Sequence, residues 1–104
     1  NLHRVWDSGM IRHTRKRWSD YAKDLNRSIT PQQLEQWQST DPMQWATESY
    51  KLAVSNAYKV PRNGELGKDY FDRNIPVVDE RLKMGGMRLA ILLNDIFSAD
   101  QGDD

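Results

Sequence analysis

The sequence predicts an all-α protein, and three observations carry that prediction. Apolar residues recur at three- and four-residue intervals through most of the chain, which is the spacing of one helix face. Two segments begin with a residue that favours helix N-termini followed by a proline. No stretch shows the alternation of apolar and polar residues that is typical of a half-buried strand. With 104 residues, the chain has the length of one domain with one modest core, and we treat residues 1–104 as a single unit.

The first helical segment covers residues 1–26, and Gly9 interrupts it, so we expect a helix, a bend and a second helix. His3 and Asp7 lie four residues apart and therefore on one face of the first helix. An imidazole nitrogen and a carboxylate oxygen that meet at one point suit a zinc ion, or they form a local pair. Two ligands alone do not complete a tetrahedral zinc site.

Two further helices are predicted from their start signals. The segment SITPQQLEQW contains an N-cap threonine, a proline at the first helical position and a glutamine that completes a capping box. The segment STDPMQWATESYKLAVSNAYKV repeats the signal with Asp41 and Pro42. We expect this helix to end at about Ala57 or Tyr58, because Pro61 follows and residues before proline avoid the helical region.

The segment VPRNGELG predicts a loop, and a long periodic helical segment follows it. The apolar stripe of this segment is Tyr70, Ile75, Val78, Leu82, Leu89, Leu92, Leu93 and Ile96. Pro76 is expected to kink the helix or to begin a new one. Gly85 and Gly86 each cost about 1 kcal/mol relative to alanine, which predicts that a neighbouring backbone approaches closely there. Residues 98–104 are expected to form a frayed acidic tail.

Composition excludes several classes of site. The chain has no cysteine, so it contains neither disulfides nor thiolate metal sites. No apolar run is long enough to span a bilayer, and no glycine-rich phosphate loop is present. The charges balance at 15 acidic and 15 basic residues, but residues 1–30 hold seven lysines and arginines against three acids. This basic end either attracts an anionic substrate or is a solvated helix face.

The aromatic residues are expected to serve mainly as core. This expectation covers all four tryptophans, Trp6, Trp18, Trp37 and Trp45, although aromatic side chains can also stack on bases. Trp6 is the tryptophan expected to support His3 and Asp7. Glu48 and Ser49 are candidates for polar residues that support a metal site.

Four segments taken together resemble one known family. NLHRVWD, WATESYKLA, YFDRNIPVVDERL and GGMRLAILLNDIF occur in that order and at suitable spacing. They are similar to the C-terminal part of the zinc-dependent, single-strand-specific nucleases and 3′-nucleotidases. These are the class I nucleases, typified by the nucleases S-one and P-one, in the zinc-dependent phospholipase C superfamily. The similarity covers nearly the whole chain, and N-L-H-x-x-W-D is its most specific element.

The resemblance implies a largely helical fold with three zinc ions in a cleft. It implies that His3 and Asp7 are ligands of one zinc, and we hypothesise that Trp6 packs behind the site and fixes the helix. A further histidine from an upstream region would complete that ion's protein ligands, and other upstream residues would hold the remaining two zincs. The chain is therefore expected to be a C-terminal fragment that is inactive without the N-terminal half, as missing sequence or as a separate chain.

The implied activity is hydrolysis of phosphoester bonds in single-stranded DNA, RNA and 3′-nucleotides, giving 5′-phosphate products from strand cleavage. The implied partners are single-stranded nucleic acid and nucleotides, not a membrane, and the implied location is secreted or periplasmic. Two alternatives stay open. One is a phospholipase C of the same superfamily, and the other is a helical interaction module in which His3 and Asp7 bind no metal.

Overall fold

The computed structural model describes residues 1–102, which are helical wherever they are regular and contain no strand. The all-α prediction is confirmed. Two short stretches, η1 and η2, are π-helical. The elements in chain order are α1 (Leu2–Arg4), η1 (Val5–Gly9), α2 (Met10–His13), α3 (Trp18–Ser28), α4 (Pro31–Gln36), α5 (Pro42–Leu52), η2 (Ala53–Ala57) and α6 (Lys68–Gly102). Within the same residues, no helix combines the length and the hydropathy needed to cross a membrane.

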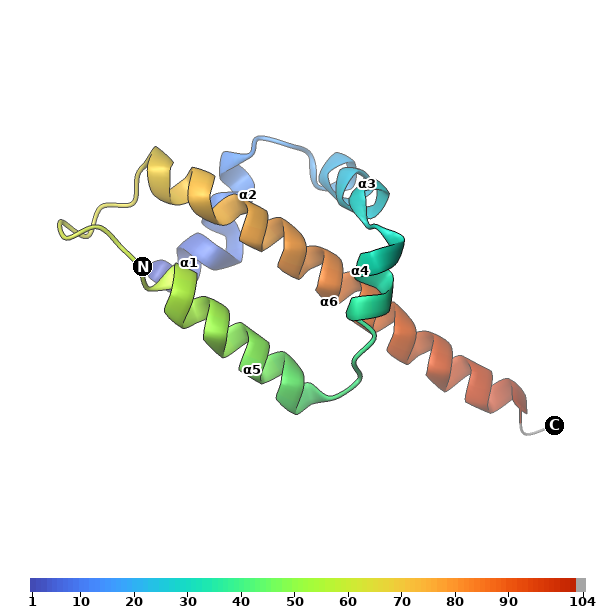
Figure 1. Cartoon of the computed structure of the whole chain (residues 1–104). Coiled ribbons are helices and arrows are strands. Elements are labelled where there is room, and N and C mark those ends of the chain that lie inside the picture. The colour runs from blue at the N-terminus through green and yellow to red at the C-terminus, as the bar shows by residue number, and fades with distance from the viewer. Residues whose placement is uncertain (103–104) are drawn as a thin grey trace.

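The long helix α6 is the axis of the molecule (Figure 1). The first helical run and α5 lie along its N-terminal half, α3 and α4 lie along its middle, and its C-terminal part projects beyond the other helices. The molecule is accordingly elongated, with extents of 62 × 30 × 25 Å.

Local sequence signals set the starts of α4 and α5. The Thr30 side chain accepts from the backbone N–H of Gln33, and the Gln33 side chain accepts from the N–H of Thr30, which is the predicted capping box. The Asp41 side chain accepts from the N–H of Met43 at 3.0 Å, and Pro42 opens α5 as predicted. The helical run that starts there continues through η2 to Ala57, where the sequence predicted its end.

The first and last helices differ from their predictions. Residues 2–13 form one continuous helical run that passes through Gly9, and the break comes at Arg15, whose φ is 59°. Within that run, the N–H of Met10 bonds to the carbonyl of Val5, so one extra residue is held in a π turn. In the last helix, Pro76 lies inside α6 without ending it. The helix also continues through residues 98–102, where a frayed tail was predicted, and residues 103–104 lie outside the described residues.

Packing forms two buried clusters on α6 rather than one core. The first contains Met10, Tyr70 and Val78, and the second contains Trp37, Met84 and Met87. Trp6 and Trp45 are half-buried. The prediction that all four tryptophans are core is wrong for Trp18, which is 85% exposed because it opens α3 outside both clusters.

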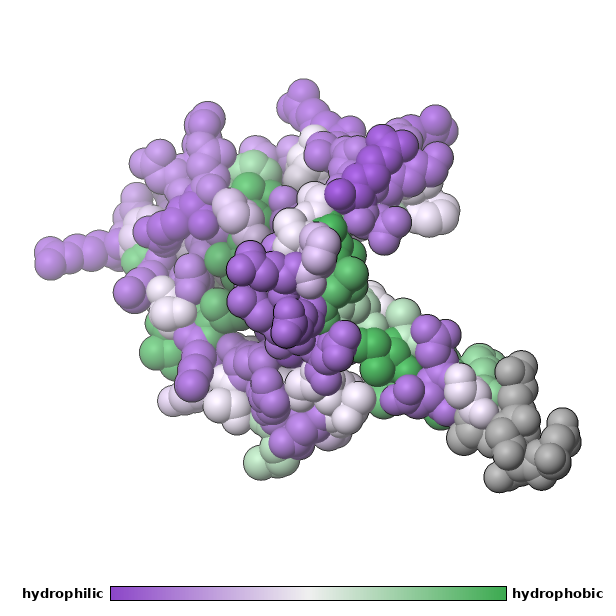
Figure 2. All heavy atoms as spheres, turned by 45° about the vertical axis from the view of Figure 1, so that its right-hand side comes forward, coloured by the Kyte–Doolittle hydropathy of each residue, from purple (hydrophilic) through white to green (hydrophobic). Residues whose placement is uncertain are grey.

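The glycine pair of α6 borders open space. A Cβ placed on Gly85 or Gly86 would meet nothing within 4 Å, so the predicted close approach of another backbone is wrong for the described part of the chain. Further along α6, Leu89, Ile96 and Phe97 are each more than half exposed. Figure 2 shows this apolar surface on the projecting end of the helix and in the hollow beside α3 and α4.

Candidate metal centre

The first helical run brings His3 and Asp7 together, as their four-residue spacing predicts. His3 Nε2 lies 2.7 Å from Asp7 Oδ2, and the two side chains are 84% and 64% exposed. The Asn1 side chain caps the helix by accepting from the N–H of Arg4 at 3.2 Å. The pair therefore sits on a capped first turn, with both the imidazole and the carboxylate near solvent.

The chemistry of this pair fits part of a zinc site. Imidazole nitrogen and carboxylate oxygen are both zinc ligands, and at bond lengths of about 2.0–2.1 Å two tetrahedral ligands stand roughly 3.3 Å apart. Small side-chain rotations would open the observed 2.7 Å contact to that spacing. In the described residues, however, no group of three or more His, Cys, Asp or Glu could hold a metal ion. The described residues bring two candidate zinc ligands together, and a complete zinc site needs at least one more protein ligand.

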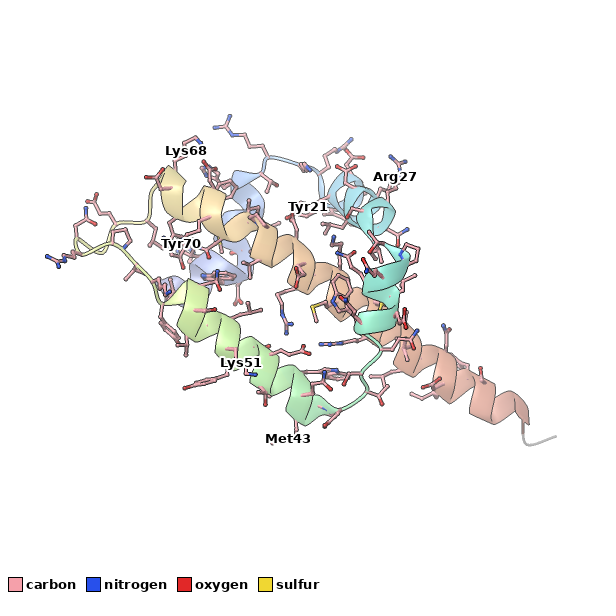
Figure 3. The ribbon with its side chains drawn as sticks, viewed as in Figure 1. Tyr21, Arg27, Met43, Lys51, Lys68 and Tyr70 are labelled. Carbon is pink, nitrogen blue, oxygen red and sulfur yellow. The ribbon has the colours of Figure 1, made fainter. Side chains whose placement is uncertain are left out.

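Trp6 anchors the turn that carries Asp7. Its indole Nε1 donates to the hydroxyl of Tyr70 at 2.9 Å, and that hydroxyl donates to the carbonyl of Ala57 at 2.7 Å. Tyr70 is 3% exposed, so this chain of bonds lies inside the protein and joins η1, α6 and η2. Figure 3 shows Tyr70 on α6 close to both neighbouring segments. The apolar stripe that contains Tyr70 does not predict these bonds, although a buried tyrosine usually needs a partner for its hydroxyl.

A pocket of about 360 Å³ lies beside His3, between the first helical run, the α5–η2 run and α6. Trp6 and Ala57, which the Tyr70 hydroxyl ties together, both line it. Its wall is mainly apolar, with Ser49 and Arg81 as polar groups. The volume falls within the range of small-molecule sites, so a group bound next to His3 would have room to enter.

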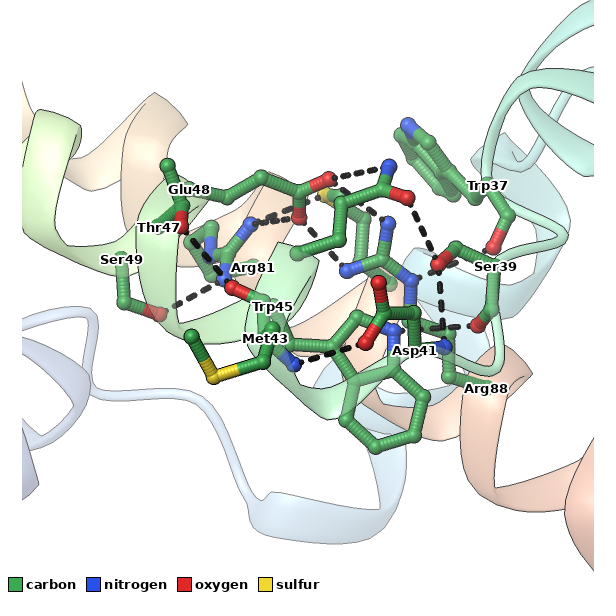
Figure 4. Close-up of polar contacts among 12 residues, drawn as sticks. Trp37, Ser39, Asp41, Met43, Trp45, Thr47, Glu48, Ser49, Arg81 and Arg88 are labelled. Carbon is green, nitrogen blue, oxygen red and sulfur yellow. Dashed lines mark hydrogen bonds and ion pairs between the residues drawn. The ribbon is translucent and has the colours of Figure 1, made fainter.

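Glu48 is the centre of a separate polar cluster that joins α5 to α6 (Figure 4). Its two oxygens accept from Arg88 at 2.6 and 3.1 Å, and one of them also accepts from Arg81 at 3.2 Å. Arg88 is 5% exposed and donates from Nε to the carbonyl of Trp37 at 3.1 Å. Hydrogen bonding from Arg88, reinforced by Arg81 and Gln44, lowers the pKa of Glu48 to about 2.

Hydrogen bonds engage Glu48 and Ser49 with the arginines of α6, although Ser49 also lines the pocket beside His3. Both Glu48 oxygens are already bonded, since Gln44 Nε2 also donates to Oε1 at 3.2 Å. Ser49 Oγ accepts from Arg81 at 2.9 Å. Glu48 and Ser49, the candidates for polar support of a metal site, hold α5 against α6. Arg88, the arginine of the GGMRLA segment, was missed, because a helical pattern does not say which charged residue is buried.

His13, the other histidine, lies at the opposite end of the same helical run. Its ring packs at 4.1 Å between centroids against Phe71, with the planes inclined by 53°. The structure thus places the two histidines differently, one against α6 and one beside a carboxylate. His13 is therefore a natural control for His3.

Comparisons with known proteins connect this geometry to a family. A family model described as S1/P1 Nuclease matches residues 1–98. Among curated proteins, Endonuclease 1 of Arabidopsis thaliana is 36% identical over 115 residues, covering 96% of this chain and 38% of its own length. Endonuclease 4 and Endonuclease 3 of the same plant are 37% and 38% identical, covering 95% of this chain and 38% and 39% of their own lengths. The chain thus spans well under half the length of these relatives. No solved structure matches it.

Proposed function

The chain belongs to the S1/P1 nuclease family, and from this premise we propose that it is the C-terminal part of a zinc-dependent endonuclease and 3′-nucleotidase. The proposed enzyme hydrolyses phosphoester bonds in single-stranded DNA and RNA and leaves 5′-phosphates. The observation that carries the proposal is the exposed pair of His3 and Asp7, with Nε2 and Oδ2 2.7 Å apart. These two residues lie in the segment NLHRVWD, at the start of the matched region.

Each residue of the segment has a role in this proposal. His3 and Asp7 hold one zinc through Nε2 and a carboxylate oxygen. When bound, zinc supplies a Lewis acid that orients the phosphate and stabilises charge on the leaving oxygen. Trp6, fixed by its bond to Tyr70, keeps the turn from shifting and so keeps the two ligands in register.

The rest of the enzyme is also part of the proposal. Because the described residues offer no third ligand next to His3, we propose that the part of the enzyme outside this chain supplies the other ligands of this zinc. It also supplies the two further zinc ions and most of the cleft that selects single strands. The 104-residue chain by itself is then expected to be inactive.

The test is a pair of histidine variants made in the complete enzyme. His3→Ala should lower the zinc content by about one ion per molecule and lower hydrolysis of single-stranded DNA at least roughly a hundredfold, because a ligand of the metal is lost. His13→Ala is the matched control. It removes the same side chain from the same helical run and should leave the zinc content unchanged. Zinc is measured by elemental analysis on protein of known mass.

Either of two results would reject the proposal. Unchanged zinc content in His3→Ala would show that the pair is no metal site and would favour the helical interaction module. Hydrolysis of phosphatidylcholine in preference to single-stranded DNA and RNA would identify a phospholipase C instead.

A further inference from the structure

A basic segment and an exposed tryptophan meet at the loop between α2 and α3. The patch consists of Arg12, Arg15, Lys16, Arg17 and Trp18, all of them exposed. Trp18 is the most exposed of the large hydrophobic residues, at 85%. We propose that this patch is a second contact for single-stranded nucleic acid, in which the cations bind phosphates and Trp18 stacks on a base. The inference rests on the proposed function.

The cations of the patch are largely free to bind an anion. Lys16 is the one that pairs with an acid, at 3.3 Å from Asp24. Within the described residues, Arg12, Arg15 and Arg17 have no carboxylate within 4 Å. Residues 12–27 together hold six lysines and arginines against two aspartates, so the local potential is positive although the whole chain is neutral.

The loop is ordered by its own hydrogen bonds. The N–H of Arg15 bonds to the carbonyl of Arg12 at 3.0 Å, and the Thr14 hydroxyl accepts from the N–H of Lys16 at 3.3 Å. That hydroxyl also donates to the carbonyl of Ile11 at 2.6 Å. With these bonds in place, Arg15 is held in the left-handed region and the chain turns sharply out of α2. A loop that is already ordered has less conformational entropy to lose when it binds a strand.

One helical run leads from the pair of His3 and Asp7 to the patch. The same helical run, residues 2–13, carries His3 and Asp7 near its start and leads into the patch at its end. Asp7 and His13 are six residues apart on it, which is roughly 9 Å along a helix. A strand of a few nucleotides could therefore reach both places.

The chemistry favours a single strand over a duplex. Single strands expose phosphates and unstacked bases, and binding surfaces for them combine cations with aromatic side chains. A duplex keeps its base faces stacked inside, so it could use the arginines but not Trp18. On α3 itself, Tyr21 turns inward and bonds to Asp79 of α6, whereas Arg27 is exposed like the patch (Figure 3).

The inference is tested by binding in the complete enzyme carrying His3→Ala, so that the strand stays intact. The probe is a fluorescein-labelled oligothymidylate of about twelve nucleotides, titrated by anisotropy at several salt concentrations. Replacing Arg15, Lys16 and Arg17 by glutamine should weaken binding roughly tenfold and reduce the slope of log Kd against log salt by about 2. Trp18→Ala should weaken binding roughly five- to tenfold with an unchanged slope. Arg62→Gln is the control, because Arg62 is also an exposed arginine and lies in the loop before α6.

The outcomes separate this inference from the proposed function. Equal affinities for the patch variants and the control would overturn the inference. A lower Tm in Trp18→Ala with unchanged affinity would also overturn it and would make Trp18 a packing residue of the complete fold. Hydrolysis of single-stranded DNA by the unmodified enzyme is measured separately. If it is absent, the proposed nuclease activity is rejected, and the binding measurements still test whether the patch contacts a single strand.

Discussion

Two acid–base clusters in this molecule have opposite surroundings. The pair of His3 and Asp7 joins residues one helical turn apart and is mostly exposed. The cluster of Glu48, Arg81 and Arg88 joins residues 33 and 40 positions apart, and Arg88 is 5% exposed. The two groups of the exposed pair contact each other and solvent, whereas every oxygen of Glu48 is bonded to groups within the protein. A buried, fully bonded cluster holds helices together, and an exposed pair is suited to binding.

The largest expected effect is the loss of protein stability when a residue of the buried cluster, rather than of the exposed pair, is replaced. Replacing Arg88 by methionine keeps most of its volume but leaves Glu48 without its bidentate partner, so the free energy of unfolding should fall by about 3 kcal/mol. His3→Ala should change it by less than about 0.5 kcal/mol, because an exposed ion pair contributes little. Urea denaturation measures both. A small effect of Arg88→Met would show that Arg81 alone suffices to pair Glu48. The buried cluster would then contribute no more to stability than the exposed pair does.

The pH dependence of the free energy of unfolding tests the contribution of the buried cluster. The pKa of Glu48 in the folded protein is about 2, below its ordinary value of 4.5, so its contribution to stability is complete above about pH 4.5 and is lost as the pH falls toward 2. The stability difference between the parent chain and Glu48→Gln should therefore shrink by roughly 2 kcal/mol between about pH 5 and pH 2. Urea denaturation at several pH values measures this difference. A difference that stays constant across that range would mean that the carboxylate is not held ionised by Arg88.

A smaller loss of stability is expected from the hydrogen bonds of Tyr70, which attach the turn that carries Asp7 to the core. Tyr70→Phe removes the hydroxyl that accepts from Trp6 and donates to Ala57, and both groups lose a partner inside the protein. The free energy of unfolding should fall by about 1–2 kcal/mol. In a double-mutant cycle, Trp6→Phe should cost less in the Tyr70→Phe background than in the parent chain, because the two residues share one bond and only the packing of Trp6 is then left to lose. Full additivity of the two changes would show that this bond does not couple them.

Much of the fold follows from short-range sequence. The capping box at Thr30, the cap at Asp41, the end near Ala57 and the facing of His3 and Asp7 all involve residues within about one helical turn of each other. Such contacts are built from neighbouring backbone and side-chain atoms, so their spacing can be read directly from the chain.

Other features were decided only by tertiary structure. Trp18 and Trp37 have the same chemistry, yet one is 85% exposed and the other 7%. Burial depends on which helix lies opposite, and Trp37 lies against α6 while Trp18 opens α3 beyond it. The bonds from Trp6 to Tyr70 and from Arg88 to Glu48 span 64 and 40 residues. No local pattern encodes such partners, because they are set by how whole helices pack. The sequence alone determined the helices and the facing of His3 and Asp7, and packing decided which polar groups stay free to bind.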